Sequence, residues 1–228
     1  MTERPYPRPP AGAAPIAAGR EADVFALDSR RVLRRYRRPA DVRDEARVMA
    51  YVADLGYPVP EVFEAHGADM VMERLDGKTL TAAMLDGDVT LDRGAATLAD
   101  LLRRLHDLQP WDHAAPGHRV VHLDLHPDNV MLTSRGPVVI DWCNATDAPA
   151  DLDTAVSALI LAQVAVDGMH VPRATAAGRF LDAFLPVAPG DPTRLLDEAG
   201  SLRARQLSLV PGETAVLTAA AARIRGEH

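Results

Sequence analysis

The first third of the chain consists of short apolar runs separated by polar turns, with one helical pattern between them. The segments EADVFAL and RVLRRY are β-type runs joined by DSR, which predicts a hairpin over residues 21–36. Between Pro39 and Gly56, four positions recur at three- and four-residue spacing, which predicts a helix with one buried stripe. The positions of this stripe are Val42, Glu45, Met49 and Val52. Two more strand-like runs follow at 60–66 and 69–75, so the order β-β-α-β-β predicts a small sheet braced by one helix.

Beyond Asp76 and Gly77 the pattern becomes helical. Helical periodicity covers the segments 79–85, 90–108, 151–166, 174–185, 191–206 and 212–224. Two short strand-like runs, 130–132 and 137–142, flank the turn TSRG.

We therefore expect an α+β protein with two lobes. A small antiparallel β-sheet lobe with one helix is expected at 13–74, and a hinge with a larger, mainly helical lobe at 75–228. Residues 1–12 are rich in proline and charge, so we expect them to form a flexible tail.

Composition narrows the class of protein. The 228 residues are 47% apolar and 25% charged, which is typical of a globular protein. A net charge of −7 argues against a nucleic-acid binder, because phosphate backbones favour clustered lysine and arginine. The single cysteine, Cys143, excludes an internal disulfide and fits a reducing compartment. With no membrane-spanning apolar stretch and no export signal, we expect a cytoplasmic protein that binds no membrane. Nothing in the pattern indicates an oligomeric state.

One stretch, VVHLDLHPDNVML at 120–132, places many polar side chains between two apolar runs. The polar residues are His122, Asp124, His126, Asp128 and Asn129. Between flanks that should be buried, these groups would be costly unless a function required them. An acidic turn with an asparagine cap is the alternative. It explains any one of these residues, but not the agreement of several independent positions.

The spacing within this stretch points to a known family. Asp124 and Asn129 are five positions apart, and Asp141 follows twelve residues later at the end of an apolar strand. This H-x-D-x-x-x-x-N pattern resembles the catalytic segment of kinases with the protein-kinase-like fold. HLDLHPDNVML followed by VVIDW is similar to the aminoglycoside phosphotransferase family, which also resembles choline and fructosamine kinases. The His-Pro after Asp124, and Trp142 where protein kinases have Phe-Gly, favour this small-molecule branch.

The resemblance implies an ATP- and Mg²⁺-dependent phosphotransferase with an alcohol group as acceptor. Asp124 is then the catalytic base, and Asn129 and Asp141 bind Mg²⁺. These residue types suit the chemistry, because phosphoryl transfer requires in-line positioning and neutralisation of phosphate charge, and oxygen ligands suit Mg²⁺. We interpret His122 as a buried hydrogen-bonding brace of the loop. His126 either contacts phosphate or stabilises the loop.

The resemblance also implies that Asp153, at the start of the helix 151–166, binds the backbone of the catalytic loop. A carboxylate at a helix N-terminus is also a good cap, and both interpretations can hold together. We assign Asp153 to structural support.

The N-terminal lobe is expected to bind the nucleotide. Backbone N–H groups at Arg20, Glu21 and Ala22 are expected to face the phosphates, although this turn has a single glycine. Arg34 lies where the family more often has lysine, and is expected to contact the α- and β-phosphates with Glu45 as its partner. Alternatively, Glu45 pairs with a surface arginine. The residues expected around the adenine are Val32, Met72, Glu73, Leu75, Leu132 and Ile140, with Glu73 and Leu75 acting through their backbone.

The acceptor is expected to be a small polar hydroxyl compound bound by the C-terminal helices and the loop before the motif. Acidic side chains there would suit an amine-bearing metabolite or antibiotic by charge pairing. The candidates are Asp86, Asp88, Trp111, Asp112, Asp182, Asp197 and Glu198. Scattered carboxylates of this kind are equally explained as solvated surface groups.

Two other functions stay open at this point. A protein kinase is disfavoured because no A-P-E-like activation segment follows IDW. A nucleotide-binding regulatory module that catalyses poorly is favoured by Arg34 and by the single-glycine turn. The presence of Asp124, Asn129 and Asp141 together disfavours it.

Overall fold

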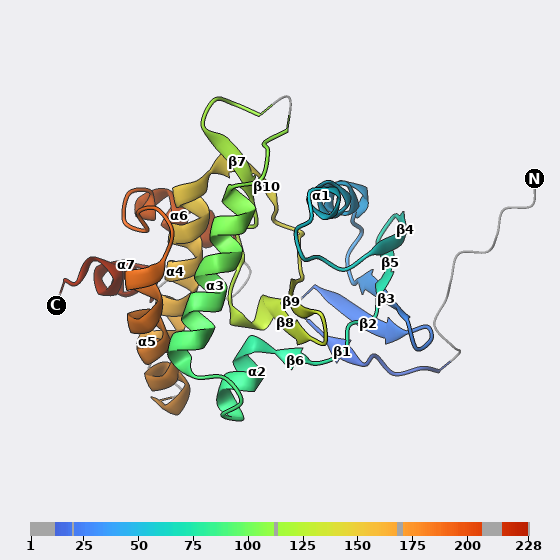
Figure 1. Cartoon of the computed structure of the whole chain (residues 1–228), viewed down its shortest axis with the longest axis horizontal. Coiled ribbons are helices and arrows are strands. Elements are labelled where there is room, and N and C mark those ends of the chain that lie inside the picture. Colours follow the sequence, from blue (N-terminus) through green and yellow to red (C-terminus); the bar gives the residue numbers. More distant parts are fainter. Residues whose placement is uncertain (1–11, 20, 112–113, 168–170, 207–215, 228) are drawn as a thin grey trace, which may run out of the picture.

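The computed structural model describes residues 12–19, 21–111, 114–167, 171–206 and 216–227. A sheet with one helix lies on one side of the molecule and a group of helices on the other (Figure 1). The two-lobed α+β architecture predicted from the sequence is therefore confirmed.

The N-terminal lobe is a five-stranded antiparallel sheet in the order β1-β2-β3-β5-β4. Its strands are β1 (Ala17–Ala18), β2 (Ala22–Ala26), β3 (Arg31–Tyr36), β4 (Val62–His66) and β5 (Asp69–Glu73). The predicted hairpin is present, since β2 pairs with β3, and the two predicted strands that follow, β4 and β5, also pair with each other. Helix α1 (Arg43–Asp54) contacts β4 and buries Glu45, Met49 and Val52, as the stripe predicted.

The second lobe contains the predicted helices and several very short strands. Its elements are β6 (Lys78–Thr79), α2 (Leu80–Leu85), α3 (Leu91–His106), β7 (His118–Val121), the 3₁₀ turn η1 (Pro127–Asn129), β8 (Val130–Thr133), β9 (Gly136–Val139), β10 (Thr146–Pro149), α4 (Ala150–Val166), α5 (Val171–Phe184), the 3₁₀ turn η2 (Leu185–Val187), α6 (Leu196–Gln206) and α7 (Leu217–Arg225). The sequence did not indicate β6, β7 or β10, because two to four residues are too few to display an alternating pattern. They form the pairs β6–β8 and β7–β10.

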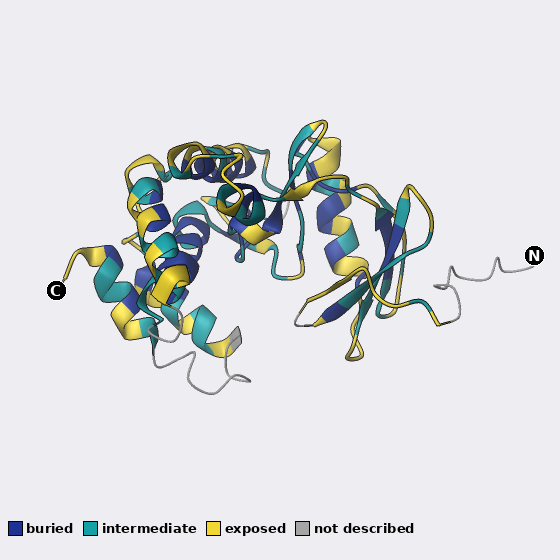
Figure 2. Cartoon of the chain, turned by 90° about the horizontal axis from the view of Figure 1, so that it is seen from below, coloured by how far each residue is buried: buried dark blue, intermediate teal, exposed yellow. Residues whose placement is uncertain are grey.

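Helix α4 is the centre of this lobe. It is buried from Asp153 to Gln163 and contacts α5, α6 and α7. A helix that is apolar on all sides is stable only when other elements cover it, and here these three helices do so together with α3, β7 and β10. Figure 2 shows that buried residues follow the inner faces of the helices, with exposed residues on the outer faces. Among the described residues, no helix combines the length and the apolar composition needed to cross a membrane.

A glycine fixes the chain where it passes from one lobe to the other. Gly77 has φ +108°, and a Cβ atom on it would lie 1.9 Å from the backbone oxygen of Leu132. Only glycine fits this close approach to β8. The change of pattern after Asp76 and Gly77 in the sequence thus coincides with a geometric requirement for glycine.

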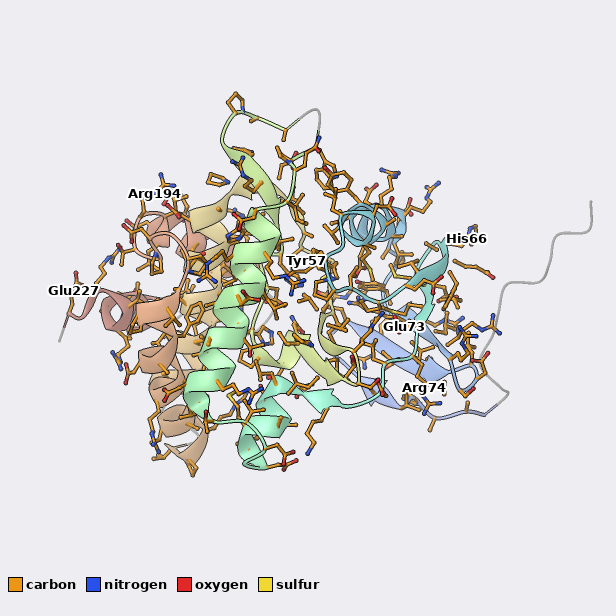
Figure 3. All side chains as sticks on the ribbon, in the orientation of Figure 1. Tyr57, His66, Glu73, Arg74, Arg194 and Glu227 are labelled. Atoms are coloured by element: carbon orange, nitrogen blue, oxygen red, sulfur yellow. The ribbon has the colours of Figure 1, made fainter. Side chains whose placement is uncertain are left out.

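Several contacts join the lobes away from this crossing, among them the following three. Glu73 at the end of β5 forms a 2.6 Å ion pair with Arg135 in the β8–β9 turn. The N–H of Val139 donates to the carbonyl of Pro58 at 2.9 Å. Tyr57, labelled between the sheet and the helices in Figure 3, donates its hydroxyl to the carbonyl of Leu101 on α3 at 3.0 Å. The last two bonds hold the segment between α1 and β4 against the second lobe.

Candidate active site

The loop that carries Asp124 follows β7, and its backbone is bonded to a side chain of α4. Asp153 is fully buried, and its carboxylate accepts the backbone N–H groups of His122 at 3.0 Å and Leu123 at 2.7 Å. It also contacts Nε2 of His106 at 3.0 Å. Burial alone would raise the pKa of Asp153, but the His106 contact and the backbone donors outweigh it and lower the pKa. Asp153 is therefore an ionised anchor for a loop whose residue Leu123 has an unfavourable φ of +58°.

The two histidines of the motif occupy different environments. His122 is fully buried, and its Nε2 lies 3.1 Å from the carbonyl of Ile140, while its Nδ1 lies 3.2 Å from the N–H of Asp124. The N–H of Asp124 can only donate, so Nδ1 is the accepting nitrogen and Nε2 carries the proton. His126 lies 3.9 Å from Asp124 and 4.0 Å from Asp128. Burial lowers the pKa of His126, although the two carboxylates act to raise it.

Asn129 is bonded directly to Asp124. Its Nδ2 donates to the backbone oxygen of Asp124 at 2.8 Å and to the carboxylate Oδ2 at 3.3 Å. Both bonds use the amide nitrogen, which leaves the side-chain oxygen of Asn129 for another partner. The hydrogen bonds between Asn129 and Asp124, five positions apart, thus close the loop on itself.

Asp141 lies beside Asn129 because β8 and β9 are antiparallel neighbours. Val130 pairs with Val139, and the N–H of Ile140 donates to the carbonyl of Asn129 at 3.0 Å. Asp141 follows the end of β9 and has φ +67°, which turns its carboxylate out of the strand direction. The side chain is 37% exposed.

The cation predicted on β3 reaches both lobes. Arg34 donates from Nη1 to Oε1 of Glu45 at 2.7 Å and from Nη2 to Oδ1 of Asp141. Tyr36, on the same face of β3, donates its hydroxyl to the other oxygen of Glu45 at 2.8 Å, and the Arg34 guanidinium lies 4.8 Å from the centre of its ring. The surface-arginine alternative for Glu45 is wrong, because Glu45 is buried and only 11% of the side chain of its partner Arg34 is exposed.

The charges in this network affect one another. Burial alone would lower the pKa of Arg34, but Asp141 and Glu45 raise it. Burial raises the pKa of Glu45, with Arg34 and Tyr36 opposing it only in part. Burial alone would also raise the pKa of Asp141, but the charge of Arg34 and its hydrogen bond outweigh this effect and lower the pKa. The more exposed Asp141 is therefore the carboxylate that stays ionised most readily.

Other predicted nucleotide residues lie on the neighbouring strands. Val32 and Met72 are cross-strand partners on β3 and β5, and each is almost completely buried. Leu75, Leu132 and Ile140 are partly exposed. The carboxylate of Glu73 is bonded to Arg135. The backbone N–H of Glu73 donates to the carbonyl of Glu61 at 2.8 Å. This bond uses the N–H of Glu73 and leaves its backbone carbonyl for a ligand.

The turn predicted to cover the phosphates is only partly described. Arg20 lies outside the described residues. Glu21 is exposed, and Ala22 begins β2. Gly19 donates its N–H to the carbonyl of Ala22 at 2.9 Å, which closes a tight turn between β1 and β2.

Most acidic acceptor candidates are already paired with cations. Lys78 contacts Asp86 at 2.5 Å and Asp88 at 2.8 Å. Asp182 pairs with Arg223, and Asp197 pairs with Arg225. The remaining candidates are Glu198, which is exposed, Trp111, which packs near Tyr51, and Asp112, which lies outside the described residues.

Two contacts at the site were not predicted from the sequence. Tyr36 joins the Arg34 network, and Arg203 of α6 donates to Oδ1 of Asp124 at 3.2 Å. The alternation along β3 places Tyr36 on the face of Arg34 and could have indicated the first contact. A cavity of about 510 Å³ next to α1, lined by residues such as Met49 and Arg135, contains none of the motif residues.

A two-lobed fold in which a largely buried β3 arginine bonds a helix glutamate and the aspartate after β9 is that of the protein-kinase-like class. Residues 12–120 and 111–196 match the Phosphotransferase enzyme family. The chain belongs to this family of phosphotransferase enzymes. A search of curated protein sequences finds no match.

Several solved structures share this fold. A thermostable mutant of aminoglycoside phosphotransferase APH(4)-Ia, in its apo form, is 15% identical with a TM-score of 0.61, and the match covers 94% of each chain. Amicoumacin kinase hAmiN in complex with AMP-PNP, Ca²⁺ and Ami is 15% identical with a TM-score of 0.58, covering 95% of this chain and 89% of the other. A choline/ethanolamine kinase family protein from Mesorhizobium loti is 13% identical with a TM-score of 0.53, covering 92% and 85%. At these identities the likeness concerns the fold.

Proposed function

We propose that this protein is an ATP-dependent kinase that transfers the γ-phosphate to a hydroxyl group of a small polar metabolite or antibiotic, with amine-bearing compounds as the first candidates. The observation that carries the proposal is the Arg34 bridge, which joins Glu45 of one lobe to Asp141 of the other. In this proposal Arg34 is the phosphate-binding cation. It bonds Asp141, which follows β9, and the strand that pairs with β9 begins just after Asn129, whose amide bonds Asp124. AMP-PNP in the amicoumacin kinase and ATP in a streptomycin complex of APH(2")-IIa support a nucleotide as the phosphate donor.

In this proposal the reaction needs little covalent work from the protein. The acceptor oxygen forms a bond to the γ-phosphorus, the bond to the β–γ bridging oxygen breaks, and ADP leaves. Asp124 orients the hydroxyl and accepts its proton. Arg34 contacts the phosphates, while Val32 and Met72 lie on the adenine side.

The residues present fit a magnesium ion. Asn129 has a side-chain oxygen that its bonds to Asp124 do not use, and Asp141 offers a partly exposed, ionised carboxylate. No group of three or more histidine, cysteine or acidic side chains in the described part of the chain is arranged to hold a metal. Two oxygen ligands suit Mg²⁺, which is usually held jointly with substrate phosphates. When bound, the ion would neutralise phosphate charge.

We also propose the lobe boundaries 13–74 and 75–228. Gly77 supports this division, because its close contact with β8 fixes the chain just after β5. A protein kinase is disfavoured, since the chain passes from Asp141 through β10 directly into α4.

An ATP-depletion assay tests the proposal. Purified protein with Mg²⁺ and ATP should convert ATP to ADP in the presence of at least one compound from a panel of amino sugars, aminoglycosides, amino alcohols and ketosamines. A thermal-shift titration with ATP should show stabilisation that increases with Mg²⁺. If ATP raises the melting temperature equally with and without Mg²⁺, and no compound of the panel is phosphorylated, the protein would instead be a nucleotide-binding regulatory module. The arginine at position 34, where the family more often has lysine, is the observation that favours this second candidate.

A further inference from the structure

Three segments that are distant in the sequence form a chain of hydrogen bonds that ends on Asp124. Arg203, in the last turn of α6, donates from Nη1 to Oδ1 of Asp124 at 3.2 Å. The same guanidinium donates from Nε to Oε1 of Gln163 on α4 at 3.3 Å. Because a guanidinium is planar and rigid, the contact with Gln163 also sets the direction of the Nη1 bond to Asp124.

Gln163 is an unusual residue for its position. It is a buried polar side chain on α4, which is otherwise almost entirely apolar from Thr154 to Val166. A buried amide costs free energy unless its groups are hydrogen-bonded. The bond from Arg203 is one that satisfies its oxygen, so the two residues belong to one arrangement.

An arginine near a helix C-terminus has an ordinary explanation, since it interacts favourably with the helix dipole. Arg225, in the last turn of α7, fits that explanation, because it pairs at 2.6 Å with the exposed Asp197 at the surface. Arg203 differs, since its side chain is only 13% exposed and reaches inward to a carboxylate that is itself largely buried. A dipole interaction does not require that direction.

Arg203 and Asn129 bond different oxygens of the same carboxylate. Arg203 takes Oδ1, while the amide of Asn129 takes Oδ2 at 3.3 Å. Two donors on two oxygens fix the plane of the Asp124 carboxylate more firmly than either would alone. The positive charge of Arg203 also offsets repulsion between Asp124 and the phosphates of a bound nucleotide.

We propose that Arg203, oriented by Gln163, is a positioning residue that holds the Asp124 carboxylate in the direction needed to receive the acceptor hydroxyl. This inference rests on the proposed function. It predicts that loss of Arg203 slows turnover and leaves nucleotide binding intact, because misplacement of a reacting group by about 1 Å costs roughly 100-fold in rate.

The test uses the full chain with Mg²⁺ and ATP, the acceptor from the panel that gives the fastest ADP formation, and water as the acceptor when none is added. The variants are Arg203→Gln, Arg203→Lys, Gln163→Leu, the double variant of Arg203→Gln with Gln163→Leu, and Arg225→Gln as the matched control. Arg203→Gln should lower kcat by roughly 10- to 100-fold with KM for ATP changed less than about twofold. Arg203→Lys should recover part of the loss by keeping the charge. Gln163→Leu should give a smaller loss, and the double variant should match Arg203→Gln because Gln163 acts through Arg203.

Each other outcome has a definite meaning. If the wild-type protein turns over ATP with neither water nor any panel compound, the proposed function fails and this inference fails with it. If the wild type is active but Arg203→Gln keeps the kcat of Arg225→Gln, only the inference is overturned. A rise in acceptor KM at unchanged kcat would make Arg203 an acceptor-binding residue. Equal losses in kcat, ATP affinity and thermal stability, with no recovery in Arg203→Lys, would reduce Arg203 to a structural role.

Discussion

Arg34 and Asp141 are joined by an ion pair although 107 positions separate them in the sequence. The pair connects β3 of the N-terminal lobe to the end of β9 in the second lobe. Arg34 also bonds Glu45, so one guanidinium holds two carboxylates from different elements. A forked arginine can make both contacts at once, whereas the compact ammonium of lysine offers no such fixed fork. Arginine at this position therefore bonds Glu45 and Asp141 at the same time.

Replacing Arg34 should destabilise the fold. In Arg34→Gln, Glu45 keeps only its bond from Tyr36 in a buried site, so we expect a loss of about 3 kcal/mol in the free energy of unfolding. Arg35→Gln is the matched control, because Arg35 is the next residue on β3 and pairs with Asp69 with 41% of its side chain exposed. That variant should lose less than about 1 kcal/mol. Urea denaturation measures both losses, and similar values would show that the buried network adds no stability.

Replacing Asp124 should separate turnover from nucleotide binding. We expect Asp124→Asn to lower kcat by roughly 10²- to 10⁴-fold, because a positioned general base contributes about that much. ATP affinity, measured by calorimetry, should change only a few-fold. Asp128→Asn serves as the control, since Asp128 lies in the same loop with 53% of its side chain exposed. Near-normal turnover in Asp124→Asn would remove Asp124 from the role of base.

Replacing Asp141 should weaken the metal-dependent part of nucleotide binding. Asp141→Asn keeps the shape of the side chain but removes the charge of a proposed Mg²⁺ ligand. ATP affinity should fall with Mg²⁺ present and change little in EDTA, as measured by calorimetric titration under both conditions. A variant that keeps the full effect of Mg²⁺ on affinity would contradict the assignment of Asp141.

Asp153 should make stability depend on pH in the acid range. Its pKa is lower in the folded protein than the ordinary aspartate value. Its stabilising contribution is therefore complete above about pH 4 and is lost as the pH falls through the folded pKa. In Asp153→Asn, the loss at neutral pH should be about 3 kcal/mol, since the new amide faces backbone N–H donors. The variant should also show a shallower decline below about pH 4 in urea denaturation, and an unchanged decline would exclude Asp153 as its source.

Gly77 should be intolerant of a side chain for steric reasons. In Gly77→Ala the new Cβ would meet the backbone oxygen of Leu132, whereas in Gly67→Ala it would meet nothing within 4 Å. Both glycines have positive φ, so Gly67→Ala measures the conformational cost of about 1 kcal/mol. Thermal denaturation should show a clearly larger loss for Gly77→Ala, and equal losses would mean that the chain can move away from β8.

Local patterns were sufficient for much of this protein. The stripe on α1 and the apolar run of α4 predicted helices that are present, because burial of one face or of all faces leaves a periodic record. The motif spacing also placed Asn129 and Asp141 at adjacent strand ends. The short strands β6, β7 and β10 had no such record, because their pairing depends on partners that lie elsewhere in the chain.

The sequence by itself determined the two-part α+β organisation and the motif from Asp124 to Asp141, since both depend on spacing between near neighbours. Only the tertiary structure decided that Arg34 bonds Asp141 as well as Glu45, that four candidate acids are paired with cations, and that Arg203 reaches Asp124. These contacts join side chains that folding brings together from distant positions. A long-range pair of this kind leaves no periodic pattern in either segment, so only the packed chain reveals it.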